Sequence, residues 1–96
     1  MPVSKETVIK EFKNIPGVGK SIALDLWELG YRSVSQLKNE NPEKMYLKFC
    51  KIKNQKIDRC LLYVFRCAVY FASNKNLETE LLKWWNWKDK STYLND

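Results

Sequence analysis

Residues 14–30 read NIPGVGKSIALDLWELG, in which two glycines one residue apart precede Lys20 and Ser21. A Gly-x-Gly-Lys-Ser string is typical of a turn that holds phosphate, either in a nucleotide hydrolase or on a nucleic-acid backbone. The P-loop pattern of nucleotide hydrolases requires a glycine where this chain has Asn14. A P-loop also follows a buried strand, whereas residues 8–14, VIKEFKN, are charged and have helical spacing. We therefore expect no nucleotide triphosphate at this turn.

The turn lies between two segments with helical patterns. Ser4 is a suitable N-cap for a first helix that ends near Lys13. A second helix is expected to begin near Lys20 or Ser21, and Gly30 supplies the left-handed residue that ends it. The sequence thus predicts two helices joined by a short glycine turn.

The rest of the chain continues the helical pattern, and no segment alternates long enough to indicate a strand. Further helices are expected from Ser33, from Asn41 to Lys51 or Ile52, over 57–73 and over 77–85. The segment 57–73 is apolar on nearly every side, so it belongs at the centre. The sequence predicts an all-α domain over residues 1–90, with five or six short helices around 57–73 and a frayed tail at 91–96.

The composition excludes several classes of protein. The chain has 96 residues, a formal net charge of +6, three cysteines and no histidine, which favours neither a zinc site nor a disulfide framework. Cys60 and Cys67 are expected to be small core residues. The first residues contain no apolar h-region, so we expect no secretory signal. The longest apolar stretch, 60–72, contains Arg66 and is too short to cross a bilayer. We expect a cytoplasmic protein with no membrane partner.

The stretch from Ile15 to Ala23 resembles the helix-hairpin-helix motif, h-x-G-h-G-x-x-x-A. Glycines at 17 and 19 allow unusual backbone angles and leave room for a phosphate near the amides. Val18 is expected to point inward as a plug between the two helices, and the small Ala23 lets them approach closely. The alternative is a plain helical hairpin that serves only for packing.

Three stretches carry a wider resemblance: IPGVGKSIALDLWELGYRSVSQL, DRCLLYVFRCAVYFA and ELLKWWNWKD. Over roughly residues 12–89 the chain resembles short bacterial proteins called pathogenicity-locus or mitomycin-resistance proteins, which are built around a helix-hairpin-helix. The resemblance implies an association with DNA repair or protection and sequence-independent binding of DNA, duplex more than single-stranded. We expect that the protein requires no cofactor.

The resemblance also implies roles for the residues of the turn. The DNA phosphate is expected at the backbone of Gly17, Val18, Gly19, Lys20 and Ser21. The carbonyls of Lys13, Ile15 and Val18 are expected to ligate a monovalent cation, Na⁺ or K⁺. A second, degenerate hairpin without glycines is expected at KIKNQK, residues 51–56, as the pseudo-twofold mate of the first.

Basic side chains cluster in the middle of the chain, where Asp58 is the only acid between residues 44 and 75. They can contact the phosphates of the DNA without reading its bases, or they can form a solvated face. The candidate contacts are Lys44, Lys48, Lys51, Lys53, Lys56 and Arg59.

Two further features can be structural or functional. Arg66 lies among apolar neighbours, and we expect an ion pair with Asp25, Glu28 or Glu80 in preference to a phosphate contact. The indoles at 84, 85 and 87 can dock the end of the chain onto the core, stack on an unpaired base or anchor a partner protein. These candidates are Trp84, Trp85 and Trp87.

No arrangement of catalytic groups stands out, because the chain lacks histidine and a recognisable pair of acids. We therefore expect no enzyme. The sequence predicts a non-sequence-specific DNA-binding module that acts through residues 15–21 and is an accessory to DNA repair or protection. The alternative is a module that binds a repair or recombination protein through its tryptophan-rich segment.

Overall fold

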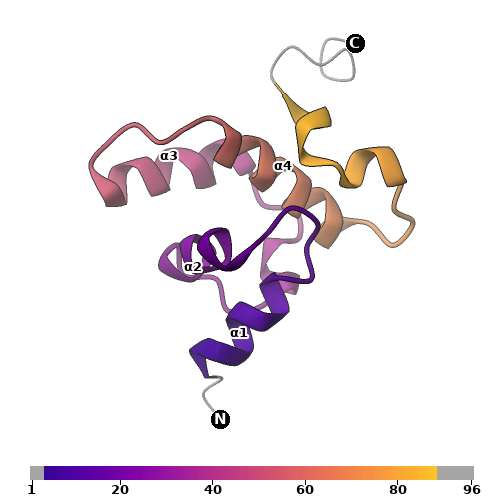
Figure 1. Ribbon diagram of the computed structural model, residues 1–96, viewed down its shortest axis with the longest axis horizontal. Helices are drawn as coiled ribbons and strands as arrows, with labels where there is room; N and C mark the ends of the chain where they lie inside the picture. Colours follow the sequence, from indigo (N-terminus) through magenta and orange to yellow (C-terminus); the bar gives the residue numbers. More distant parts are fainter. Residues whose placement is uncertain (1–3, 89–96) are drawn as a thin grey trace.

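The protein is seen here in a computed structural model that describes residues 4–88, so the expected tail at 91–96 lies outside the described residues. The described residues form helices and turns and contain no strand, which confirms the all-α prediction (Figure 1). The four α-helices are α1 (Lys5–Phe12), α2 (Lys20–Glu28), α3 (Pro42–Lys53) and α4 (Cys60–Ser73). Three short 3₁₀ turns complete the chain: η1 (Val34–Leu37), η2 (Thr79–Leu82) and η3 (Trp84–Trp87).

The capping residues confirm the predicted starts of α1 and α3 and the predicted end of α2. The Ser4 hydroxyl accepts the N–H of Thr7 at 3.2 Å. Asn41 accepts two N–H groups of the first turn of α3 through Oδ1, with Pro42 at the first helical position. Gly30 has φ +103°, and the N–H of Tyr31 donates to the carbonyl of Leu26 in α2 at 3.1 Å. This is the Schellman ending that glycine favours.

Two predicted helices differ from those observed. The central helix begins at Cys60 instead of residue 57, because the carboxylate of Asp58 accepts the N–H of Cys60 and so sets the start of α4. The single helix expected over 77–85 is instead the pair η2 and η3. They are separated at Lys83, which is extended with φ −94° and ψ 112°. The break allows the indole N–H of Trp87 to donate to the carbonyl of Leu81 at 2.8 Å.

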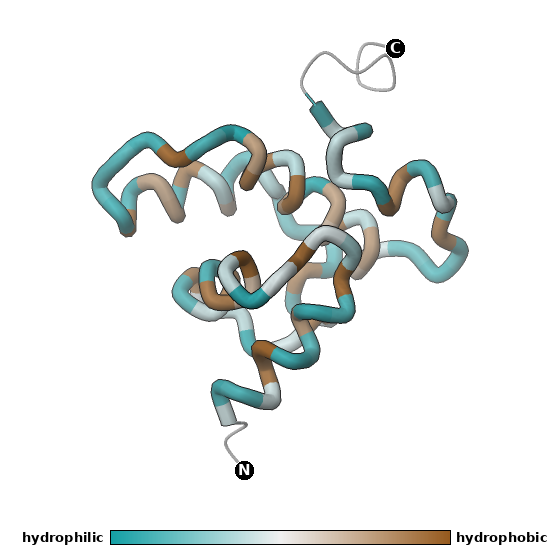
Figure 2. Tube along the Cα trace, viewed as in Figure 1, coloured by the Kyte–Doolittle hydropathy of each residue, from teal (hydrophilic) through white to brown (hydrophobic). Residues whose placement is uncertain are grey.

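The apolar core lies around α4, as its pattern predicts. Leu62, Phe65 and Ala68 are buried, and α4 packs against α3, η1, η2 and η3. The apolar residues of the other helices alternate with hydrophilic ones along the chain (Figure 2). Of the two cysteines expected in the core, Cys67 is buried but Cys60 is exposed, since Cys60 is the first residue of the helix. Within residues 4–88, none of the helices has the length and apolar character needed to cross a bilayer.

Candidate nucleic-acid interface

The glycine turn, residues 14–19, joins α1 to α2 and is held from inside by its apolar residues. Ile15 and Val18 are buried, and the Val18 N–H donates to the carbonyl of Ile15 at 3.0 Å. Gly17 has φ +84°, a conformation that other residues rarely adopt. Ala23 is fully buried between the helices. Val18 is therefore the expected plug, and its side chain takes no part in the exposed surface.

The N-terminus of α2 presents amides that the chain itself does not use. Gly19 is the N-cap and offers no side chain, and the first turn of α2 contains no acid. Within residues 4–88, no acceptor bonds the N–H groups of Gly19, Lys20 or Ser21, and all three residues are exposed. Unpaired N–H groups and the helix dipole together favour an anion at this position.

The two glycines of the turn serve different purposes, which corrects one expectation. Gly19 has φ −95° and ψ −169°, an extended conformation that any residue adopts. A Cβ added to Gly19 would meet nothing within 4 Å. Only Gly17 needs its backbone freedom, and Gly19 matters because it leaves the adjacent amides uncovered.

The second turn, residues 54–59, joins α3 to α4. Unlike the first turn, it has a side chain of the protein bonded at the N-terminus of the helix that follows. Asn54 takes the left-handed conformation with φ 53°, and the Gln55 N–H bonds to the carbonyl of Cys50 at 3.1 Å. The Asp58 carboxylate accepts the N–H of Cys60 at 2.8 Å, and this bond holds the pKa of Asp58 below its usual range. A carboxylate of the chain thus occupies the helix N-terminus where an external anion would bind.

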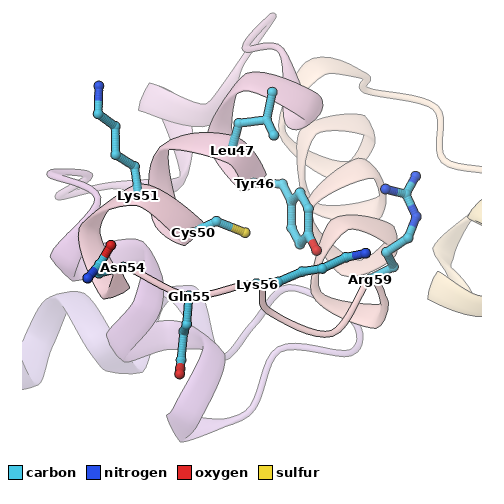
Figure 3. A pocket seen from close by; sticks show the side chains of 8 residues that line it. All are labelled: Tyr46, Leu47, Cys50, Lys51, Asn54, Gln55, Lys56 and Arg59. Atoms are coloured by element: carbon cyan, nitrogen blue, oxygen red, sulfur yellow. The ribbon is translucent and has the colours of Figure 1, made fainter.

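A hollow of about 510 Å³ lies beside the second turn, between the end of α3 and the start of α4 (Figure 3). Tyr46 and Cys50 point into it, and the Tyr46 hydroxyl donates to the carbonyl of Ile57. Burial raises the pKa of Tyr46. Lys56 and Arg59 also line the hollow, so cations surround it although its helix N-terminus is closed.

The predicted basic cluster divides into two groups. Lys44, Lys48 and Lys51 share the exposed face of α3 with Leu47, which is 64% exposed. Lys53 instead forms a salt bridge to Glu28 at 2.7 Å.

One member of the exposed group also touches α2. Lys48 donates to the carbonyl of Leu29 at 3.4 Å. Lys48 and Lys53 therefore join α3 to α2, whereas Lys44 and Lys51 have no ion-pair partner within residues 4–88.

A second basic surface, which the sequence reasoning missed, lies between α1 and α2. A groove of about 680 Å³ is lined by four lysines, one glutamate and two apolar residues: Lys5, Glu6, Ile9, Lys10, Lys13, Lys20 and Leu24. The spacing of Glu6, Ile9, Lys10 and Lys13 places them on one helical face and could have indicated this surface.

Arg66 forms the expected structural ion pair, but with a different acid. Its Nε and Nη2 bond to Glu43 Oε2 at 2.9 and 2.6 Å, and Nη1 donates to the carbonyl of Trp87 at 2.7 Å. None of the three predicted acids is this partner, because α3 runs along α4 and brings its first turn to Arg66. The Arg66 side chain is 12% exposed and joins three segments.

The three candidate indoles have different environments. Trp84 packs against the core and against Gly17, and Trp87 lies 5.7 Å from the ring centroid of Tyr70. Trp85 is 49% exposed and meets Trp84 edge to face. Trp84 and Trp87 therefore dock the end of the chain, and Trp85 alone presents a large open surface.

Comparison with protein families shows to which family the chain belongs. A family model described as pathogenicity locus (Cdd1) matches residues 5–92, which includes both turns and the tryptophan-rich segment. The chain belongs to this family. No curated protein and no solved structure matches the chain in the same comparisons. The family description names no ligand and no reaction, so function has to be argued from the site.

Proposed function

We propose that this member of the pathogenicity-locus family is a helix-hairpin-helix module that binds the phosphate backbone of DNA without reading sequence, as an accessory to DNA repair or protection. The observation that carries the proposal is the contrast between the two turns. The N-terminus of α2 is open, whereas Asp58 closes that of α4. Exposed amides at Gly19, Lys20 and Ser21 can bond one phosphate, and the Lys20 ammonium adds charge beside them.

The second turn would contact the opposite strand by a different means. Asp58 already accepts the N–H of Cys60 there, but Lys51, Lys56 and Arg59 surround the adjacent hollow. Lysine binds phosphate through a single ammonium group, and arginine can bind it through two N–H groups of its guanidinium. Such phosphate contacts do not distinguish one base from another. Duplex DNA is the expected ligand, because two such surfaces can reach two strands.

We infer that a monovalent cation binds at the carbonyls of the first turn, because they keep free acceptor capacity. Within residues 4–88, no N–H donates to the carbonyls of Lys13 or Val18, and Ile15 accepts only the Val18 N–H. These oxygens would hold the cation, which would supply positive charge beside the bound phosphate. Within the described residues, histidine, cysteine and acidic side chains form no group of three or more that could hold a metal ion.

A second candidate function is the binding of a repair or recombination protein through the end of the chain. It is supported by the exposed indole of Trp85. Binding through this aromatic side chain would resist salt and would be lost in Trp85→Ala. DNA binding would instead fall steeply as salt rises, because each phosphate contact releases counterions.

The experiment that tests the first function is fluorescence anisotropy of a labelled blunt duplex across a salt series. Gly19→Val places a branched side chain over the open amides, and the extended backbone with empty space around its Cβ accepts valine. Ser33→Val is the matched control, because Ser33 is also an extended N-cap without a side-chain cap bond.

We expect wild type and Ser33→Val to bind alike and Gly19→Val to bind at least about tenfold more weakly, the loss of one or two charge-assisted hydrogen bonds. Circular dichroism should show equal helix content in all three proteins. Equal binding by folded Gly19→Val, or no binding by wild type at low salt, would contradict the proposal.

A further inference from the structure

The groove between α1 and α2 combines cations with an apolar floor. Lys10 and Lys13 from the α1 side and Lys20 from α2 line it, and Ile9 and Leu24 supply apolar surface between them. Leu24 is partly exposed and does not belong to the set packed around the buried core. A side chain outside the core that lines a groove is available to a ligand.

The groove begins at the open amides of the glycine turn. Lys13 is the C-cap of α1 and Lys20 is the first residue of α2, so these two lysines flank the turn. Lys5 lies at the other end, where its ammonium is 5.9 Å from the ring centroid of Trp27. At the helical rise per residue, Lys5 and Lys13 are about 12 Å apart along α1.

The lysines of the groove keep their charges free of ion pairs within the described residues. Within residues 4–88, none of Lys5, Lys10, Lys13 and Lys20 forms a salt bridge, in contrast to Lys53 with Glu28. Glu6 is the single acid among the lining residues. The groove therefore attracts a polyanion that continues from the phosphate at the turn.

The apolar floor decides which form of nucleic acid fits. A blunt duplex presents phosphates and sugars to a protein, and its bases remain stacked inside. An unpaired nucleotide can turn an apolar base face toward a protein while its phosphates meet cations. We propose, on the basis of the DNA-binding function above, that the groove binds a single-stranded tail that extends from a duplex held at the glycine turn.

The test compares three labelled DNAs on the full chain: a blunt duplex, the same duplex with an unpaired tail, and the tail alone. Lys10→Glu removes one cation of the groove, and Leu24→Gln removes part of the apolar floor. Lys75→Glu is the control for net charge, since Lys75 is exposed and does not line the groove.

We expect wild type and Lys75→Glu to bind the tailed duplex about fivefold or more tightly than the blunt duplex, the effect of ordering one unpaired base. Lys10→Glu and Leu24→Gln should lose this gain and keep most of their affinity for the blunt duplex. Equal affinity of wild type for tailed and blunt duplex would overturn the inference, as would an equal loss on both DNAs in Lys10→Glu.

These outcomes separate the two proposals. If Gly19→Val weakens binding of the blunt duplex, but wild type binds the tailed duplex no more tightly than the blunt one, the proposed function stands and the groove binds no strand. If tail binding depends on Lys10 but Gly19→Val changes nothing, the groove binds single strands and the phosphate turn is only structural. Absence of binding to all three DNAs overturns both.

Discussion

The indole of Trp84 lies against the backbone of Gly17. A Cβ placed on Gly17 would come within 2.9 Å of Trp84 Cδ1, closer than side chains normally approach. The end of the chain thus packs directly on the turn that presents the amides. The buried thiol of Cys67 lies beneath the same region, with its sulfur 3.4 Å from the carbonyl of Leu82, and burial raises its pKa to about 11. The tryptophan-rich segment therefore supports the glycine turn, although the two are far apart in sequence.

Gly17→Ala should destabilise the protein by about 1–2 kcal/mol or more, because alanine is strained at positive φ and its methyl group would meet Trp84. Trp84→Ala should also destabilise the protein, through lost packing against the core. The double variant should lose less than the sum, since Trp84→Ala removes the steric conflict. Urea denaturation of the four proteins measures this coupling. Strict additivity would show that Trp84 does not contact the turn in solution.

The local pattern of the sequence was sufficient to predict most helix ends, whereas long-range partners were not predictable. Ser4, Asn41 and Gly30 act on backbone groups within a few residues, so their roles follow from the sequence alone. The pairing of Arg66 with Glu43 depends on how α3 runs along α4, which local patterns do not determine. The same limit applies to the contact between Trp84 and Gly17, which lie far apart in sequence.

Arg66 should matter for stability and not for DNA binding. Arg66→Lys keeps the charge but cannot contact Glu43 and the Trp87 carbonyl in the same way, and we expect a loss of about 1–2 kcal/mol. Guanidinium chloride denaturation measures this loss. Duplex affinity at a temperature where both proteins are folded should be unchanged, and a clear fall in affinity would instead identify Arg66 as a phosphate contact.

The exposed lysines of α3 should respond differently from Lys53. Lys44→Glu and Lys51→Glu should weaken duplex binding and each lower the slope of log K against log salt by about one, as expected for a lost phosphate contact. Lys53→Ala should instead cost about 0.2–1 kcal/mol of stability by breaking the partly exposed salt bridge to Glu28. An unchanged salt slope in both glutamate variants would show that this face of α3 is only solvated.

Asp25 is a source of pH-dependent stability beneath the glycine turn, where it lines a hollow together with Gly17 and Trp84. Burial, then the nearby charge of Glu28, raises its pKa above the usual range. Because the pKa is higher in the folded than in the unfolded state, the folded protein binds the proton more tightly. The free energy of unfolding is therefore greater at low pH, and this stability is lost as the pH rises through the raised pKa.

Asp25→Asn should therefore raise Tm at pH 7, and the gain should shrink as the pH falls toward the ordinary value of 3.8. Thermal denaturation of both proteins between pH 3 and pH 7 measures this difference. Below the ordinary pKa the acid is neutral in both states, so the two proteins should converge there. A constant difference in Tm across the series would show that the charge of Asp25 is not the cause.

The carboxylate at the second turn suggests a substitution that would occupy the free amides of the first. At the start of α4, the Asp58 carboxylate, one residue before the N-cap, accepts the N–H of Cys60; Gly19→Asp would place a carboxylate at the N-cap of α2. Aspartate is a better N-cap than glycine and interacts favourably with the helix dipole, so stability should rise by about 0.5 kcal/mol, or about 2–4 °C in Tm.

The same substitution should abolish phosphate binding, because its carboxylate occupies the amides and repels the DNA. Stability and affinity should thus change in opposite directions, which a variant that merely disturbs the fold cannot produce. Gly19→Asn is the matched control, since asparagine also caps a helix but carries no charge, and it should retain more of the affinity. If Gly19→Asp is more stable than wild type and binds duplex DNA equally well, the amides at the start of α2 are not the phosphate site.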